Sequence, residues 1–297
     1  MSARKTVIAL FFLLISGTIL PNHVKAQEEV QQDSIVQITL TDGSVIRGRI
    51  VQETDTEIRI ITASGIEMTL PRSSIVSIGE SRGRMVEGEF RQSDPNYSRL
   101  FFSPTGRPLR KGDGYFSDFY IVFPSVAYGV TDNFSFMAGM SIIPTLGLGN
   151  QLFYVAPRIG GDVGENASIS AGILYATMAN EGFGAGIAFA TGTFGEPDES
   201  ITVGMGWGYA MDTGGDFFFE ERPIILVGGN FRLSNSVAFV TENWLITGAN
   251  TNAWPFTVGL RFFGERVAAD LGFILIGEAL SEGFPIPLAS FVYNFGK

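Results

Sequence analysis

The sequence predicts an all-β protein: a transmembrane, antiparallel β-barrel of about 12 strands that follows a small five-stranded β unit. Three observations support this prediction. The chain contains 37 glycines and 26 phenylalanines but only 17% charged residues, and no apolar run long enough for a transmembrane helix follows residue 26. Turn signals recur at regular intervals. Between these turns, apolar and polar residues alternate with the period of two that is typical of β-strands.

Residues 1–26 have the features of a secretory signal peptide. Arg4 and Lys5 provide the positive start, residues 7–20 form the apolar centre, and residues 24–26 (VKA) place small side chains before a cleavage site. An uncleaved membrane anchor is the alternative, but Pro21 ends the apolar run before it is long enough to span a bilayer. We therefore expect an exported protein.

Residues 27–82 are predicted to form the small domain, with strands over residues 35–40, 44–52, 57–62, 66–72 and 75–79. The patterns LTDGSVIRGRI (40–50) and IRIITASG (58–65) resemble those of SH3-like and Sm-like barrels. The resemblance implies a small five-stranded β-barrel, which we expect to act in the periplasm as a module that binds a partner protein or as a spacer. Because the chain is acidic and exported, we expect no nucleic acid as partner.

Residues 83–96 are predicted to be a linker and residues 97–297 the membrane barrel. The segments FFSPTGRPLRKGDGYF (101–116) and YGVTDNFSF (128–136) resemble uncharacterised outer-membrane β-barrel proteins of the Bacteroidota type. This resemblance implies a barrel architecture and a location in the cell outer membrane, in contact with outer-membrane lipid, and it implies no activity.

The strand count follows from the connections, because short turns alternate with longer loops as periplasmic turns and extracellular loops do in membrane barrels. Eleven strands are clear between residues 115 and 295, and parity requires one more before them. The expected strands cover residues 97–107, 115–130, 133–143, 151–160, 166–177, 183–194, 200–211, 222–232, 236–246, 254–263, 266–276 and 285–295. The last strand should pair with the first, turn its aromatic residues Phe291, Tyr293 and Phe295 outward, and present itself to the barrel assembly machinery.

Six charged residues within these strands are candidates for the barrel lumen: Asp118, Arg158, Arg232, Glu242, Arg261 and Asp270. All but Glu242 lie on the face opposite the bulky apolar residues of their strands, and a charge that faces lipid at the midplane costs about 2–4 kcal/mol. We therefore expect them to point inward. They either select a solute or form a buried ion-pair network, which Tyr154 and Asn230 would complete. Three lumen-facing glycines (Gly204, Gly206, Gly208) would leave room for a plug, a passage or a bound chain, or would relieve crowding.

The composition also restricts the chemistry. The chain has no cysteine, and its one histidine, His23, lies in the predicted signal peptide. We therefore expect no metal site, no cofactor and no enzymatic activity, with only a carboxylate-based reaction left as an alternative. Two functions fit the sequence: a passive or weakly selective outer-membrane channel with a periplasmic interaction module, or a structural barrel with a closed pore whose small domain binds a periplasmic partner.

Overall fold

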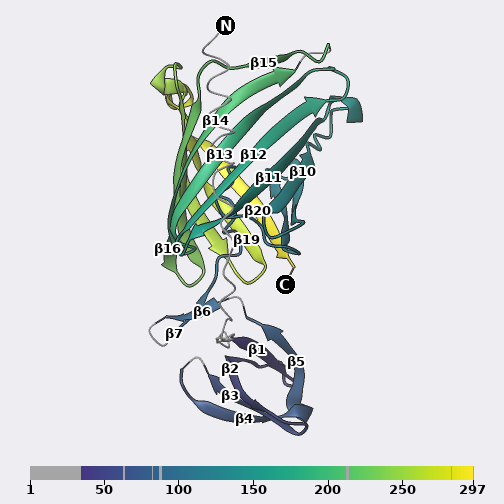
Figure 1. The fold of residues 1–297 in the computed structure, drawn as a ribbon, viewed down its shortest axis with the longest axis vertical. Coiled ribbons are helices and arrows are strands. Elements are labelled where there is room, and N and C mark those ends of the chain that lie inside the picture. Colours follow the sequence, from purple (N-terminus) through teal and green to yellow (C-terminus); the bar gives the residue numbers. More distant parts are fainter. Residues whose placement is uncertain are drawn as a thin grey trace, which may run out of the picture. The chain divides into compact units, whose positions relative to one another are not determined.

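The computed structural model describes residues 35–62, 64–81, 83–86, 89–211, 214–281 and 283–296, and it shows an all-β protein (Figure 1). The predicted signal peptide, residues 1–26, lies outside the described residues. Helices in the described part of the chain are short, and none has the length and hydrophobicity that a membrane-spanning helix needs.

The small unit is an antiparallel sheet with the strand order β4-β3-β2-β1-β5, so the five predicted strands are confirmed. Its strands are β1 (Val36–Leu40), β2 (Val45–Glu53), β3 (Glu57–Thr62), β4 (Glu67–Pro71) and β5 (Ile75–Glu80), with the 3-10 turn η1 (Arg72–Ser74) before β5. Alternation directs Ile38, Ile58 and Ile60 into its core, where each is fully buried. Among the described residues no pairing joins β4 to β5, so closure into an SH3-like barrel stays a prediction.

The predicted linker contains a short hairpin. Strands β6 (Gly83–Val86) and β7 (Glu89–Gln92) pair with each other in a separate two-stranded sheet. The chain then reaches the barrel through residues 93–96.

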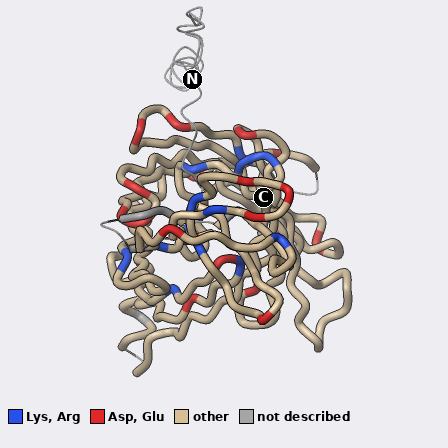
Figure 2. The backbone as a smooth tube through the Cα atoms, turned by 90° about the horizontal axis from the view of Figure 1, so that it is seen from below, with Lys and Arg blue, Asp and Glu red and all other residues tan. Residues whose placement is uncertain are grey.

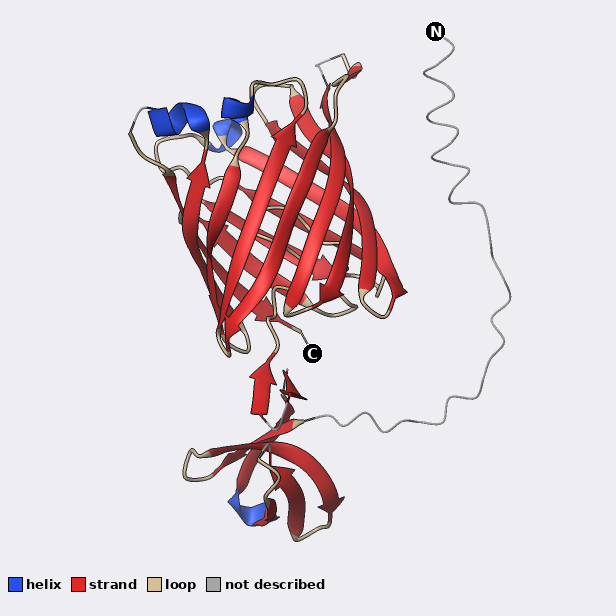
Figure 3. Ribbon diagram, turned by 90° about the vertical axis from the view of Figure 1, so that its left-hand side faces the viewer, coloured by secondary structure: helices blue, strands red, loops and turns tan. Residues whose placement is uncertain are grey.

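Twelve antiparallel strands form a closed barrel, which confirms the predicted count (Figures 1 and 3). They are β8 (Gly114–Phe119), β9 (Phe123–Gly129), β10 (Phe134–Met140), β11 (Leu152–Gly164), β12 (Ala167–Met178), β13 (Gly184–Glu196), β14 (Glu199–Met211), β16 (Ile224–Ser234), β17 (Val237–Ile246), β18 (Phe256–Phe263), β19 (Val267–Leu275) and β20 (Ile286–Phe295). Strand β15 (Phe217–Phe219) pairs only with the end of β14. The long connections carry the short helical elements η2 (Leu148–Asn150), η3 (Thr251–Ala253) and α2 (Gly277–Ser281).

The first strand is not the predicted one. Residues 97–107 form no strand of the wall, and the predicted strand 115–130 is instead a hairpin of β8 and β9. Its turn contains Tyr120 and Ile121, both with positive φ (57° and 64°), a conformation that L-residues rarely adopt. Tyrosine and isoleucine are not residue types that predict such a turn. Strand β20 therefore pairs with β8, from Ser290 opposite Phe119 to Phe295 opposite Gly114. The two errors cancel in the strand count.

The predicted faces of the strands are otherwise confirmed. On β14, Ile201, Val203, Met205 and Trp207 are exposed on the outside while the residues between them face inward. The outer surface carries exposed apolar side chains on most of the wall strands, and charged residues are sparse along the chain (Figure 2). On the last strand, Phe291 and Tyr293 are exposed and Ser290, Val292 and Asn294 are buried. The barrel thus has an apolar exterior and a lumen filled by inward side chains.

Candidate functional site

The lumen contains residues 94–109, which we call the luminal segment. Instead of crossing as a strand, it folds back on itself: the N–H of Leu100 donates to the carbonyl of Ser103 at 2.9 Å, and the N–H of Thr105 donates to that of Ser98 at 3.0 Å. Its polar residues are buried, among them Asp94, Asn96, Ser98, Arg99, Ser103 and Thr105. A backbone with so few internal bonds needs partners from the wall.

Glu242 on β17 provides the most extensive of these contacts. Its fully buried carboxylate accepts the backbone N–H groups of Phe101 and Phe102, each at 2.9 Å, and that of Ser103 at 3.2 Å. The Ser103 hydroxyl and the Trp244 indole N–H, both at 2.8 Å, complete five donors. The negative charge is stabilised by hydrogen bonds to the loop that it holds.

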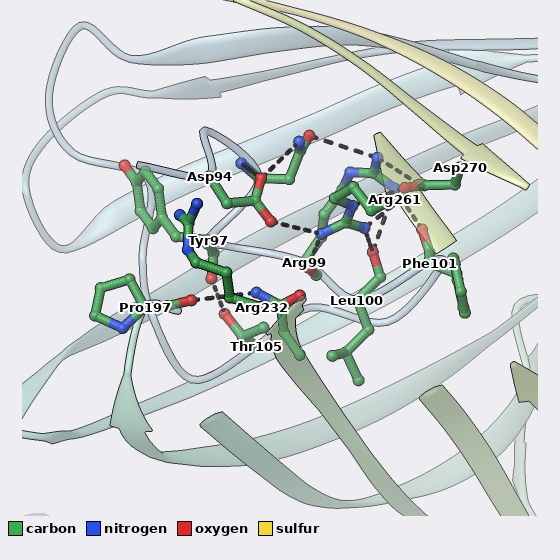
Figure 4. Close-up of polar contacts among 12 residues, drawn as sticks. Asp94, Tyr97, Arg99, Leu100, Phe101, Thr105, Pro197, Arg232, Arg261 and Asp270 are labelled. Atoms are coloured by element: carbon green, nitrogen blue, oxygen red, sulfur yellow. Dashed lines mark hydrogen bonds and ion pairs between the residues drawn. The ribbon is translucent and has the colours of Figure 1, made fainter. Parts of the chain in front are cut away.

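Arg261 and Asp270 form a second anchor (Figure 4). They face each other on β18 and β19, and the Arg261 Nε donates to Asp270 Oδ1 at 2.7 Å. Arg261 also donates to the Leu100 carbonyl at 2.6 Å and lies 3.4 Å from Asp94, while Arg99 donates to Asp270 Oδ2 at 2.9 Å. The positive charges of Arg99 and Arg261 and the negative charges of Asp94 and Asp270 therefore balance one another where the segment meets the wall. All four side chains are almost completely buried.

The opposite wall of the barrel holds the luminal segment by contacts with the backbone of the segment. Arg158 on β11 is buried, and its Nη1 donates to the carbonyls of Ser98 at 3.1 Å and Thr105 at 3.2 Å. The N–H of Gly106 donates to the Thr193 hydroxyl at 2.8 Å, and Arg107 donates to the Gly195 carbonyl at 2.7 Å.

Tyr97, which precedes the barrel strands, donates its hydroxyl to Asp113 at 3.2 Å. Burial, followed by the nearby Asp113 carboxylate, raises the pKa of Tyr97 to about 12.

The remaining two candidate residues differ in their placement. Arg232 on β16 faces inward, where it forms an ion pair with Asp198 at 2.5 Å near the β13–β14 turn. Asp118 does not face the lumen. Its register partner on β20 is the exposed Phe291, which places it on the outer face, and its carboxylate accepts the N–H of Phe123 across the hairpin. Strand β8 has Tyr115 and Ser117 on its inner face, so the size of the side chains alone does not show which face of this strand is the outer one.

Glycines allow the segment to come close to the wall, although not the glycines that the sequence suggested. A Cβ at Gly106 would lie 2.2 Å from the Ser168 carbonyl oxygen, and one at Gly228 would lie 2.4 Å from the Leu100 side chain. By contrast, a Cβ at Gly204 or Gly206 would meet neighbouring side chains of the wall, those of Thr191 and Ile187. Close contact between the segment and the wall thus explains Gly106 and Gly228, and it does not explain Gly204 or Gly206.

Apolar side chains fill the space around this polar layer. One cluster contains Leu109, Tyr115, Ala127, Ala238, Phe263, Ala268 and Val292; the other contains Leu100, Phe101, Leu226, Val240 and Leu288. A cavity of about 170 Å³ remains beside the segment, and it is bordered by Phe102, Leu174, Ile187, Phe189, Leu226 and Trp244. In the part of the chain that the structure describes, no cluster of three or more acidic, histidine or cysteine side chains is positioned to hold a metal ion.

The wall residues of this site were predicted from the sequence, but the luminal segment was not. Glu242, Arg158, Arg261 and Asp270 meet there, whereas residues 97–107 were expected in the wall. Pro104 does not identify the segment, because prolines also lie within the wall strands β9 (Pro124), β11 (Pro157) and β20 (Pro287).

Comparisons with known proteins add little to this description. No protein-family model and no curated protein matches the sequence. Among solved structures, the chain is similar to the KdgM porin in complex with disordered oligogalacturonate, with a TM-score of 0.41 and 8% identity over 63% of this chain and 98% of that one. It is also similar to the NanC porin, with a TM-score of 0.38 and 8% identity over 62% of this chain and 97% of that one. Similarity at this level carries no argument about function.

Proposed function

We propose that the protein is an outer-membrane β-barrel whose pore is closed by the luminal segment, and whose small β domain acts in the periplasm as an interaction module. The observation that carries this proposal is the anchoring of the segment by Glu242 and by the Arg261–Asp270 pair. Buried, charge-assisted hydrogen bonds to opposite walls hold this loop in place, so the loop is a structural part of the lumen.

The outer surface supports the membrane location. Its exposed apolar side chains alternate with inward polar ones along the strands, as in barrels that face lipid outside and a polar interior. Strands β11 to β14 have 12 to 13 residues, which exceeds the roughly 9–11 that cross a bilayer.

A channel is the second candidate, and the cavity beside the luminal segment is the observation that favours it. Conduction through this barrel would need the segment to move, because residues of the segment pack against several walls at once. A passive, permanently open pore is the less favoured form of this function.

Conductance in planar bilayers tests the two candidates. We expect purified, folded wild-type protein to give no reproducible current steps. A variant with Glu242→Leu and Arg261→Met should give steps, because both anchors of the segment are removed. Steps from wild type equal to those of the variant would contradict a closed pore, and heat-modifiable migration on a gel verifies that each sample contains a folded barrel.

The small domain is tested in the full-length protein by crosslinking in intact cells. A photoreactive residue at Val76, which is 65% exposed on β5, should crosslink a periplasmic protein reproducibly. The matched control places the same residue at Ile38 in the buried core of the sheet. If both positions give the same crosslinks or none, the module is a spacer.

A further inference from the structure

We propose that the luminal cavity binds a small amphiphile with a single negative charge, such as a medium-chain carboxylate, and that Arg158 is the residue that recognises the charged group. This inference goes beyond the closed-pore proposal, because a ligand could occupy the cavity whether or not the segment ever moves. It is carried by three features: the size of the cavity, its mainly apolar lining, and a buried cation on that lining for which the described residues provide no ion pair.

The cavity has about 170 Å³, slightly more than the engineered apolar cavity of about 150 Å³ that holds benzene, so it takes part of the alkyl chain of a medium-chain carboxylate. Leu174, Ile187 and Phe189 come from neighbouring strands β12 and β13, and Leu226 and Trp244 come from β16 and β17. Gly204 and Gly206 on β14 add no side chain to the space between these groups. An apolar chain of a ligand would replace contacts with water by contacts with these side chains.

Polar groups border the same cavity: Ser98, Arg99, Ser103, Ser135, Arg158 and Thr191. Arg99 is neutralised by Asp270, so its charge is already compensated. The cavity is therefore lined mainly by apolar side chains, with these polar groups and the Arg158 guanidinium among them. This lining suits a ligand that is mostly apolar and carries one charged group.

Arg158 is the group that defines the charge of the ligand. Only 8% of the residue is exposed, and its hydrogen bonds go from Nη1 to two backbone carbonyls. Within the described residues, no carboxylate forms an ion pair with it, whereas Arg99, Arg232 and Arg261 each have one. A buried guanidinium without a counter-ion is costly, and an anionic headgroup at its remaining N–H groups would complete a bidentate pair.

The experiment measures equilibrium binding of radiolabelled decanoate to the full-length protein held in an amphipol, with decanol as the uncharged analogue. We expect one saturable site per chain for decanoate and at least tenfold weaker binding of decanol. Leu174→Trp, which fills the apolar side, should weaken decanoate binding at least tenfold. The matched control, Ile173→Trp, places the same ring on the outer face, where Ile173 is 48% exposed, and should leave binding unchanged.

The charge requirement is tested by Arg158→Gln and Arg158→Lys, with Arg232→Gln as the control, since Arg232 does not border the cavity. The Gln variant should bind decanoate and decanol alike, and the Lys variant should retain most of the preference for decanoate. Because Arg158 also holds the segment, each variant is first checked for heat-modifiable migration. If an Arg158 variant fails to fold, the Leu174→Trp variant and the comparison of decanoate with decanol still test the proposal.

Two results would overturn the proposal. Non-saturable binding that is equal in Leu174→Trp and Ile173→Trp would mean partition into the amphipol. Equal affinity of decanoate and decanol for wild type would remove the role of Arg158. Conductance measurements are independent of both outcomes, so a failure here is distinguishable from a failure of the closed-pore proposal.

Discussion

Replacing Glu242 by glutamine tests how the luminal segment is held. The substitution keeps the size of the side chain and replaces one acceptor oxygen with an NH₂ group. If the amide nitrogen takes the place of Oε2, it opposes the N–H groups of Phe101 and Phe102; if it takes the place of Oε1, it opposes the indole N–H of Trp244. At least one buried donor is left without an acceptor in either orientation.

The magnitude follows from these contacts. An unsatisfied buried donor costs about 1–3 kcal/mol, and each remaining bond loses about 1 kcal/mol when its acceptor becomes neutral. A buried amide is less costly than a buried carboxylate, which offsets part of the loss, so we expect about 3 kcal/mol of destabilisation. Urea titration of the protein folded into lipid vesicles, followed by tryptophan fluorescence, gives the free energy of unfolding. Glu199→Gln, at an exposed position, is the control and should change it little.

A change in the Glu242→Gln variant within about 1 kcal/mol of wild type would refute the reasoning, because a net loss that small is the size of one ordinary hydrogen bond. It would mean that the carboxylate does not hold the segment through its charge.

Three further predictions use the same assay. Gly106→Ala should lower stability, because its Cβ would lie 2.2 Å from a wall carbonyl, whereas Gly147→Ala, with open space around it, should not; equal effects would show that the segment is loosely held. Arg261→Met should cost about 3–5 kcal/mol, because the buried carboxylate of Asp94 loses its ion pair and Asp270 is left with Arg99, while exposed Lys111→Met should be near neutral. Val203→Arg on the outer face, where the neighbouring strands place Gly192 and Val227 beside it, should cost about 2–4 kcal/mol in vesicles, and Val203→Leu much less. If the arginine were tolerated equally well, the outer face would not contact lipid at that depth.

Most strands could be predicted along the whole chain, because each one depends on the local alternation of apolar and polar residues. The outward residues are those expected: Ile201, Val203, Met205 and Trp207 on β14 and Ile169 and Ile173 on β12. The five strands of the small sheet lie between the turns that the sequence indicates. The first hairpin was not predictable in this way. Its turn uses Tyr120 and Ile121 in a left-handed conformation that only the surrounding structure enforces.

From the sequence alone, charged residues of the wall strands were expected to face inward, since a charge on an apolar outer face is costly. The structure buries Arg158, Glu242, Arg261 and Asp270, whereas Asp118 lies on the outer face of a strand that has bulky residues on both faces. What these side chains hold was decided only by the tertiary structure. Their partners are backbone groups of residues 98–105 and, for Asp270, the guanidinium of Arg99; these groups lie about 140 to 170 positions away from Glu242, Arg261 and Asp270 in the chain. No local pattern encodes a hydrogen bond over that separation, because it exists only once the barrel has closed around the segment.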